Sequence, residues 1–212
     1  MVKKFSAVLL LLIGLQSAPI AQATTVTVQE LSTSPNKIVN IQVTGFYSGN
    51  AYAGVVNMLV DGVQNQGFCI DPFHFSSHNP LQYEVVPLAE APKALAGVFP
   101  GDMGDVKADK ISKLWAMAYL PNSPTWGGAA AAAMQIAIWE IVAGDKFSVT
   151  GNDYGASTLL TQLDSYTGPK ANLIALTGPG QDYVIAIPDG GATLLMLSLA
   201  TGALLLTRRF RS

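Results

Sequence analysis

Gln135 is the first residue of this chain whose type and position could carry chemistry. It belongs to residues 129–142, AAAAAMQIAIWEIV, a stretch with only two polar side chains. Five consecutive alanines give the stretch a high helix propensity, and helical spacing then places Gln135 on one apolar face with Ile138 and Trp139. A buried amide without a hydrogen bond costs about 1–3 kcal/mol. We therefore predict that Gln135 has a hydrogen-bonding partner or has been chemically changed.

Cys69 is the second candidate, because it is the only cysteine among the 212 residues. It follows the dipeptide Asp61-Gly62, which is typical of two-residue turns between antiparallel strands. The register of that hairpin predicts that Cys69 lies opposite Gly54, where the missing side chain leaves room for the sulfur. A lone cysteine cannot form an internal disulfide, so burial, reactivity and intermolecular pairing are the roles open to it.

Two short motifs around these residues resemble the thioester domains of bacterial surface adhesins. That family has an aromatic-Cys-apolar strand, matched here by residues 68–70, and then a Gln-x-Ala-apolar-Trp helix, matched by residues 135–139. The resemblance extends over roughly residues 47–144. It implies that the sulfur of Cys69 and the side-chain carbonyl of Gln135 form an internal thioester.

The implied bond places strong demands on the protein, because an amide is the more stable acyl form in water. The fold must hold sulfur against carbonyl carbon, and such alignment can supply effective molarities of about 10⁵ M or more. Ammonia leaves as the bond forms, and an amine on a partner could then attack Gln135, attach covalently and free Cys69. Four apolar side chains are suited to keep water from this bond: Phe68, Ile70, Ile138 and Trp139.

Readings without a thioester remain open. Cys69 could be a small buried hydrophobe and Gln135 a satisfied core amide. Asp71 and Glu140 are near these residues in sequence and could orient groups or relay protons, or could be solvated or capping residues. A cysteine hydrolase built on Cys69 and His74 is the weakest reading, because no third orienting group is evident in the sequence.

The two histidines of the chain do not predict a metal site. His74 and His78 are four residues apart, but the serines and prolines around them favour a solvated loop over a helix. No further histidine exists to complete a ligand set. We expect no metal, no cofactor and no enzymatic activity.

The beginning of the chain predicts export. Within residues 1–23, Lys3 and Lys4 precede an apolar run over residues 7–15 and then the small-residue site Ala21-Gln22-Ala23. This order is typical of a secretory signal peptide cleaved after Ala23.

The end of the chain predicts a second targeting segment. Residues 187–191, IPDGG, precede an uncharged run over residues 192–207 and then all three arginines of the chain. This order resembles the PEP-CTERM class of sorting signals in its VPDSG variant, which implies that an exosortase-type processing enzyme cuts near the motif. The uncharged run is slightly shorter than the ~20 residues that usually span a bilayer, and the arginines favour a cytoplasmic tail. A plain membrane anchor is the alternative. The motif itself is formed by Pro188, Asp189, Gly190 and Gly191.

Composition narrows the partners of the central region. Residues 24–187 contain seven lysines, no arginine and thirteen carboxylates, which leaves a formal net charge of −6. Nucleic acid is an unsuitable partner for such a surface. The region is long enough for one domain with its own core.

The elements that must position these residues predict an α+β fold. Alternating or apolar runs predict strands over residues 25–31, 37–46, 55–60, 63–70, 83–88, 147–150, 172–177 and 182–187, with a turn at 34–36. Helical patterns cover residues 108–120, 129–142 and 156–166. Strands dominate both ends and helices fill the middle, so we expect a β-sandwich or barrel with a helical insertion over residues 24–186.

These observations lead to two expectations for function. The first is an exported cell-surface domain that binds an amine-bearing protein or polysaccharide covalently through Cys69 and Gln135. The second is a structural component of the envelope or extracellular matrix with no reactive bond. Both place the protein first in the membrane and then on the cell surface or outside the cell.

Overall fold

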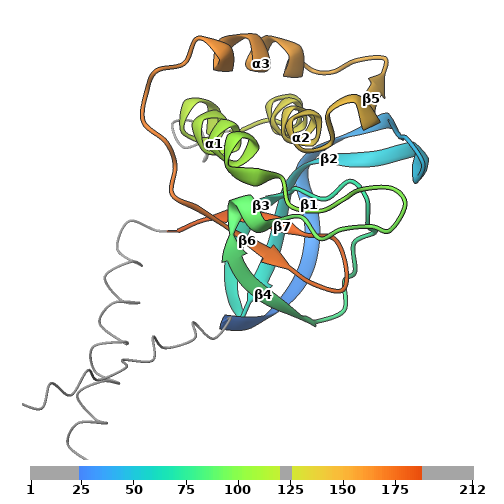
Figure 1. The fold of residues 1–212 in the computed structure, drawn as a ribbon, viewed down its shortest axis with the longest axis vertical. Helices are drawn as coiled ribbons and strands as arrows, with labels where there is room; N and C mark the ends of the chain where they lie inside the picture. Colours follow the sequence, from blue (N-terminus) through green and yellow to red (C-terminus); the bar gives the residue numbers. More distant parts are fainter. Residues whose placement is uncertain (1–23, 120–125, 188–212) are drawn as a thin grey trace, which may run out of the picture.

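Seven antiparallel strands form one sheet in the computed structural model, which describes residues 24–119 and 126–187 (Figure 1). The strands are β1 (Thr24–Val43), β2 (Tyr47–Val60), β3 (Val63–Cys69), β4 (Leu81–Pro87), β5 (Phe147–Thr150), β6 (Leu173–Thr177) and β7 (Tyr183–Ala186). The order is β2-β3-β7-β6-β4-β1-β5, and β1 also pairs with β2. Six strands therefore close into a ring, and β5 adds to β1 outside it. The predicted α+β class is confirmed at this level.

The helices are inserted between β4 and β6. They are α1 (Gly104–Leu114), which continues as the π-helical turn η2 (Trp115–Tyr119), then α2 (Gly128–Ala143) and α3 (Ala156–Asp164), with short 3-10 turns η1 (Leu88–Glu90) and η4 (Gly144–Lys146). In Figure 1 the three α-helices lie together at one end of the strand ring. Within the part of the chain that the structure describes, no helix is long and apolar enough to cross a membrane. The predicted signal peptide and sorting signal lie outside the described residues, apart from Ile187.

Helix α2 is buried on nearly every side. Twelve of its 16 residues are buried, and it packs against β1, β2, β3, β5, α1 and α3. The small side chains of its alanines allow these neighbours to approach closely. Gly128 shows the limit of this approach, because a Cβ on it would overlap the backbone carbonyl of Asn36. The prediction that this helix buries a single face is therefore wrong, because residues on nearly every side of it are buried.

Strand β1 corrects one boundary prediction. Residues 34–36 were expected to form a turn between two strands, but β1 runs unbroken through them and pairs with β2 on both sides. The pairing register shifts between Glu30 and Ser32 and again between Thr33 and Asn36. These bulges absorb the extra residues while the strand continues. A Pro-Asn pair is compatible with a bulge as well as a turn, and only the partner strand decides between them.

The hairpin before Cys69 forms as predicted, but the pairing of its two strands ends before it reaches Cys69. Asp61 and Gly62 both have positive φ, as a two-residue hairpin turn requires. The pairing of β2 with β3 stops at Gly67, and Cys69 pairs with Tyr183 of β7. Gly54 pairs instead with a residue of β1. The prediction that Cys69 lies opposite Gly54 is wrong, because β3 changes partner from β2 to β7 before it reaches the cysteine.

Gly54→Ala should destabilise the protein, because Gly54 lets the backbone of β1 approach. A Cβ at this position would overlap the Pro35 carbonyl and lie 2.6 Å from the Asn36 Cβ. We expect a loss of about 1–3 kcal/mol in the free energy of unfolding, as for other overpacked sites, measured by urea denaturation. Gly127→Ala is the matched control, because its Cβ would meet nothing within 4 Å. Equal losses in the two variants would contradict this account of Gly54.

Candidate functional site

Cys69 and Gln135, 66 residues apart in the chain, meet where α2 packs on the end of β3. The backbone N–H of Cys69 donates to Gln135 Oε1 at 3.0 Å, and Gln135 Nε2 donates to the Cys69 carbonyl at 2.7 Å. Both residues are buried, with 2% and 1% of their surface exposed. Gln135 has the hydrogen-bonding partner that its burial predicted. Both polar ends of its amide are held by the backbone of the one residue that carries the thiol.

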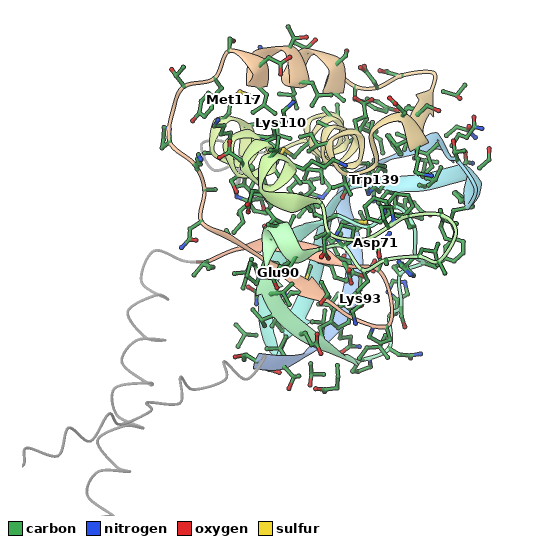
Figure 2. The ribbon with its side chains drawn as sticks, viewed as in Figure 1. Asp71, Glu90, Lys93, Lys110, Met117 and Trp139 are labelled. Atoms are coloured by element: carbon green, nitrogen blue, oxygen red, sulfur yellow. The ribbon has the colours of Figure 1, made fainter. Side chains whose placement is uncertain are left out.

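The sulfur of Cys69 accepts hydrogen bonds from two N–H groups. The backbone N–H of Asp71 and the indole Nε1–H of Trp139 each lie 3.2 Å from Sγ, and Figure 2 shows Asp71 and Trp139 close together where α2 faces the loop after β3. Burial, and then the negative charge of Asp71, raise the pKa of the Cys69 thiol well above its usual range. The resting sulfur is therefore a neutral thiol, beside two donors that would stabilise a thiolate formed there.

The four predicted pocket residues are all buried, but they do not share one role. Phe68, Ile70, Ile138 and Trp139 have 3% or less of their surface exposed. Only Trp139 makes a hydrogen bond to the sulfur. Neighbouring residues of a strand face opposite sides, and Phe68 accordingly packs its ring against the rings of a separate aromatic group. That group consists of Trp115, Tyr119 and Trp126, at centroid distances of 5.5, 5.2 and 6.3 Å from Phe68.

Asp71 holds the imidazole of His74. Asp71 is fully buried; its Oδ2 lies 2.7 Å from His74 Nδ1, and its Oδ1 accepts the backbone N–H of Phe73 at 2.9 Å. Burial raises the pKa of Asp71, and the nearby His74 opposes that shift. Sequence analysis gave Asp71 as a residue that could orient other groups but did not pair it with His74; the structure makes that pairing. Between the described side chains of Cys69 and His74 there is no direct hydrogen bond.

A cavity of about 420 Å³ connects this buried pair with the surface. Cys69, Gln135, Trp139 and His74 contribute to its wall. In another part of its lining, the rings of Phe46, Tyr47 and Phe75 contact one another, with Phe75 at centroid distances of 5.1 and 5.8 Å from the other two. The described lining of the cavity contains carboxylate, imidazole, amide and aromatic groups and neither lysine nor arginine. A small amine could therefore reach Gln135 without competing with a resident ammonium group.

Residues just before β7 support the site from the other side. Gln181 Nε2 donates to the carbonyls of Asp71 and His74 at 3.1 and 3.3 Å, which anchors the loop between them. The buried carboxylate of Asp182 accepts the backbone N–H groups of Lys93 and Gly178 at 2.7 and 2.8 Å. The N–H of Asp182 in turn lies 3.4 Å from Asp71 Oδ2. Sequence reasoning missed these residues, since they lie more than 100 positions from the loop and carry no local motif.

Two other sequence expectations can be placed. The carboxylate of Glu140 lies on α2, and burial, then Asp153, raise its pKa; no described hydrogen bond joins it to Cys69 or Gln135. His74 and His78 lie in a loop, as predicted. Among the described residues, no cluster of three histidine, cysteine, aspartate or glutamate side chains is arranged to hold a metal ion.

No protein-family model, curated protein or solved structure matches this chain.

Asp182→Asn should change how stability depends on pH. Burial raises the pKa of Asp182 to about 6, above the value of about 3.9 in an unfolded chain, so the folded protein binds this proton more tightly. The contribution of Asp182 to stability is therefore greatest near pH 4 and falls as the pH rises through about 6. Urea unfolding between about pH 4 and pH 7 should show wild type losing stability relative to Asp182→Asn across this window.

Asp153→Asn provides a control of opposite sign. Hydrogen bonds from Ser157 and Gly155 lower the pKa of Asp153. Its contribution is present above the unfolded pKa and is lost as the pH falls, so wild type should gain stability relative to this variant as the pH rises through about 4. The same trend in both variants would contradict the assignment for Asp182.

Proposed function

We propose that this protein is an exported cell-surface protein that binds amine-bearing partners covalently through a thioester between Cys69 and Gln135. The observation that carries the proposal is the pair of hydrogen bonds that holds the Gln135 amide against Cys69. The burial of both residues and the cavity that reaches them add support. An amide and a lone thiol are thus brought together in a buried site that is open to a small nucleophile.

Formation of the bond follows from the same contacts. Cys69 Sγ attacks Cδ of Gln135, the Cδ–Nε2 bond breaks, and the amide nitrogen leaves as ammonia with the thiol proton. Negative charge develops on Oε1 during the attack, and the N–H of Cys69 already donates to that atom. Because the pKa of the thiol is raised, Cys69 keeps its proton until the attack, and that proton then passes to the leaving nitrogen.

Capture of a partner reverses the roles of sulfur and nitrogen. The amine attacks Cδ, the Cδ–Sγ bond breaks, and a new amide joins Gln135 to the partner. The departing thiolate meets the N–H groups of Asp71 and Trp139, which lower the cost of its charge. It then takes up the proton that the amine nitrogen has lost.

Localisation belongs to the same proposal. Residues 1–23 act as a signal peptide, and residues 187–212 act as a sorting signal with a membrane helix and a basic tail. An exosortase-type enzyme would process the precursor at the membrane. The net charge of −6 over residues 24–187 suits cationic, amine-bearing ligands on proteins or polysaccharides rather than nucleic acid.

A second candidate is a structural envelope or extracellular-matrix component with no reactive bond. One observation favours it: both polar atoms of the Gln135 side chain already have partners on Cys69. The same contacts can therefore fasten α2 to β3 without any chemistry.

The thioester predicts a mass defect in the purified mature protein. Its mass should fall below the sequence mass by one ammonia. Methylamine should then raise the mass to one methylene above the sequence mass, by forming an N-methyl amide at Gln135, and expose one free thiol. Cys69→Ala should abolish both signatures and leave the fold intact, because it removes one small buried group. Intact-mass spectrometry with thiol titration measures all of these.

Gln135→Glu is the matched control, because it keeps the size of the side chain but has no amide nitrogen to release as ammonia. It should show its full sequence mass and a titratable thiol from the start. Fresh wild-type protein with full sequence mass and a reactive Cys69 would contradict the thioester and leave the second candidate.

The sorting signal makes a separate prediction. Replacing Pro188 and Asp189 together by alanine should keep the protein in the membrane fraction, because the processing enzyme would lose its motif. Fractionation of cells and medium by immunoblot tests this, with a double alanine change at Arg208 and Arg209 as a comparison for the basic tail. Equal release of wild type and the Pro188/Asp189 variant would show that the tail is only an anchor.

A further inference from the structure

Asp71 contacts both the imidazole of His74 and the sulfur of Cys69. The backbone N–H of Asp71 lies 3.2 Å from Cys69 Sγ, and the carboxylate of the same residue lies 2.7 Å from His74 Nδ1. The other carboxylate oxygen accepts the N–H of Phe73, and Gln181 Nε2 donates to the carbonyls of Asp71 and His74. These contacts hold the loop from both sides, so the His74 ring and the Cys69 sulfur keep fixed positions relative to each other.

The two nitrogens of the His74 ring have different surroundings. Asp71 occupies Nδ1, and Nε2 has no hydrogen-bond partner among the described residues. The ring shares the cavity wall with Cys69 and Gln135, and 26% of the side chain is exposed. An imidazole oriented by a carboxylate, with its other nitrogen free at a cavity, has the arrangement of a base and its orienting group.

We propose that His74, positioned by Asp71, is the general base for covalent capture and accepts the proton of the attacking amine. The inference rests on the proposed thioester. As the nitrogen of the amine bonds to Cδ of Gln135, it becomes positively charged, and His74 Nε2 removes one proton from it. The Cδ–Sγ bond then breaks, a neutral amide remains, and the proton on His74 passes to the Cys69 thiolate. Bonds and charges balance without any further reactant.

The surroundings of His74 allow a cationic amine to approach. The titratable groups that line the cavity with the ring are Glu30 of β1, Tyr47 and Tyr52 of β2, Cys69 of β3 and His78 in the loop. Asp71 contacts the ring directly, and the backbone N–H of Asp182 lies against Asp71. No lysine or arginine is among the described residues that line the cavity, so nothing there repels an incoming ammonium ion or an imidazolium formed in the reaction. A primary amine is mostly protonated at neutral pH. Its unprotonated fraction is the nucleophile, and that form loses one proton to His74 as the new amide forms.

The test is His74→Asn in the full mature protein. The asparagine amide can still donate to Asp71 from a position close to that of Nδ1, but it has no basic nitrogen. The variant should keep the mass defect of one ammonia, while its second-order rate of methylamine capture falls on the order of 100-fold, within the usual contribution of a general base. The rate, calculated for unprotonated methylamine, should rise with pH in wild type and stay flat in the variant.

His78→Asn is the control for loss of an imidazole from the same loop. Its Nδ1 lies 3.2 Å from the backbone carbonyl of Glu30, and this variant should retain the pH dependence of wild type. Asp71→Asn should slow capture less than His74→Asn, because it weakens the orientation of the base but leaves it in place.

The outcomes separate this inference from the proposed function. Equal rates and equal pH dependence in wild type and His74→Asn would overturn the role of His74 and leave the thioester standing. A His74→Asn protein that folds, by circular dichroism, but has full sequence mass would assign His74 to bond formation and overturn its assignment to capture. Full sequence mass in wild type would overturn both.

Discussion

The two hydrogen bonds between the Gln135 amide and the backbone of Cys69 constrain everything around them, because neither group can be left unpaired in the core. They fasten the middle of α2 to the last residue of β3. Strand β3 has by then left β2 and joined β7, so the contact also fixes the strand that brings Asp182 to the site. A helix of small and apolar residues suits this place, since it can be buried on all sides and still present one amide.

In the described part of the site, acidic groups are paired with backbone N–H groups, a hydroxyl and the His74 ring, and neither lysine nor arginine lines the cavity. The carboxylates of Asp71 and Asp182 are buried, and both accept backbone N–H groups. The carboxylate of Glu30 is also buried and accepts the hydroxyl of Tyr183 at 2.9 Å. This concentration of negative charge has a chemical consequence. Burial and the negative charge of Asp71 raise the pKa of the Cys69 thiol, so the sulfur stays protonated. The backbone N–H of the same Asp71 donates to that sulfur.

Access and protection are divided between the two sides of β3. On one side, Cys69 faces the cavity with Gln135, Trp139 and His74. On the other, Phe68 is packed against the aromatic group of Trp115, Tyr119 and Trp126, which removes that side from water. The alternation of side chains along a strand produces this division. Among the described residues, the approach for a small amine to a reactive bond at Cys69 is therefore from the cavity side.

Several features of the protein could be predicted from its sequence because they depend on neighbours in the chain. The alanine-rich helix, the turn at Asp61-Gly62, the short strand β5 and the α+β class follow from propensity, periodicity and turn chemistry. The burial of Gln135, and its need for a partner, also followed from the pattern around it. The two short motifs were enough to single out Cys69 as the partner of Gln135.

The tertiary structure alone decided how these parts meet. The change of partner by β3, the continuous course of β1 and the role of Gly54 depend on hydrogen bonds to strands distant in the chain, which period and turn signals do not encode. The same holds for the orientation of His74: its carboxylate partner is only three residues away, but the buried position of that carboxylate depends on residues before β7. Local sequence determined which groups were present and which elements carried them. Long-range closure of the strand ring determined which of those groups touch, because each contact required two distant segments to be paired first.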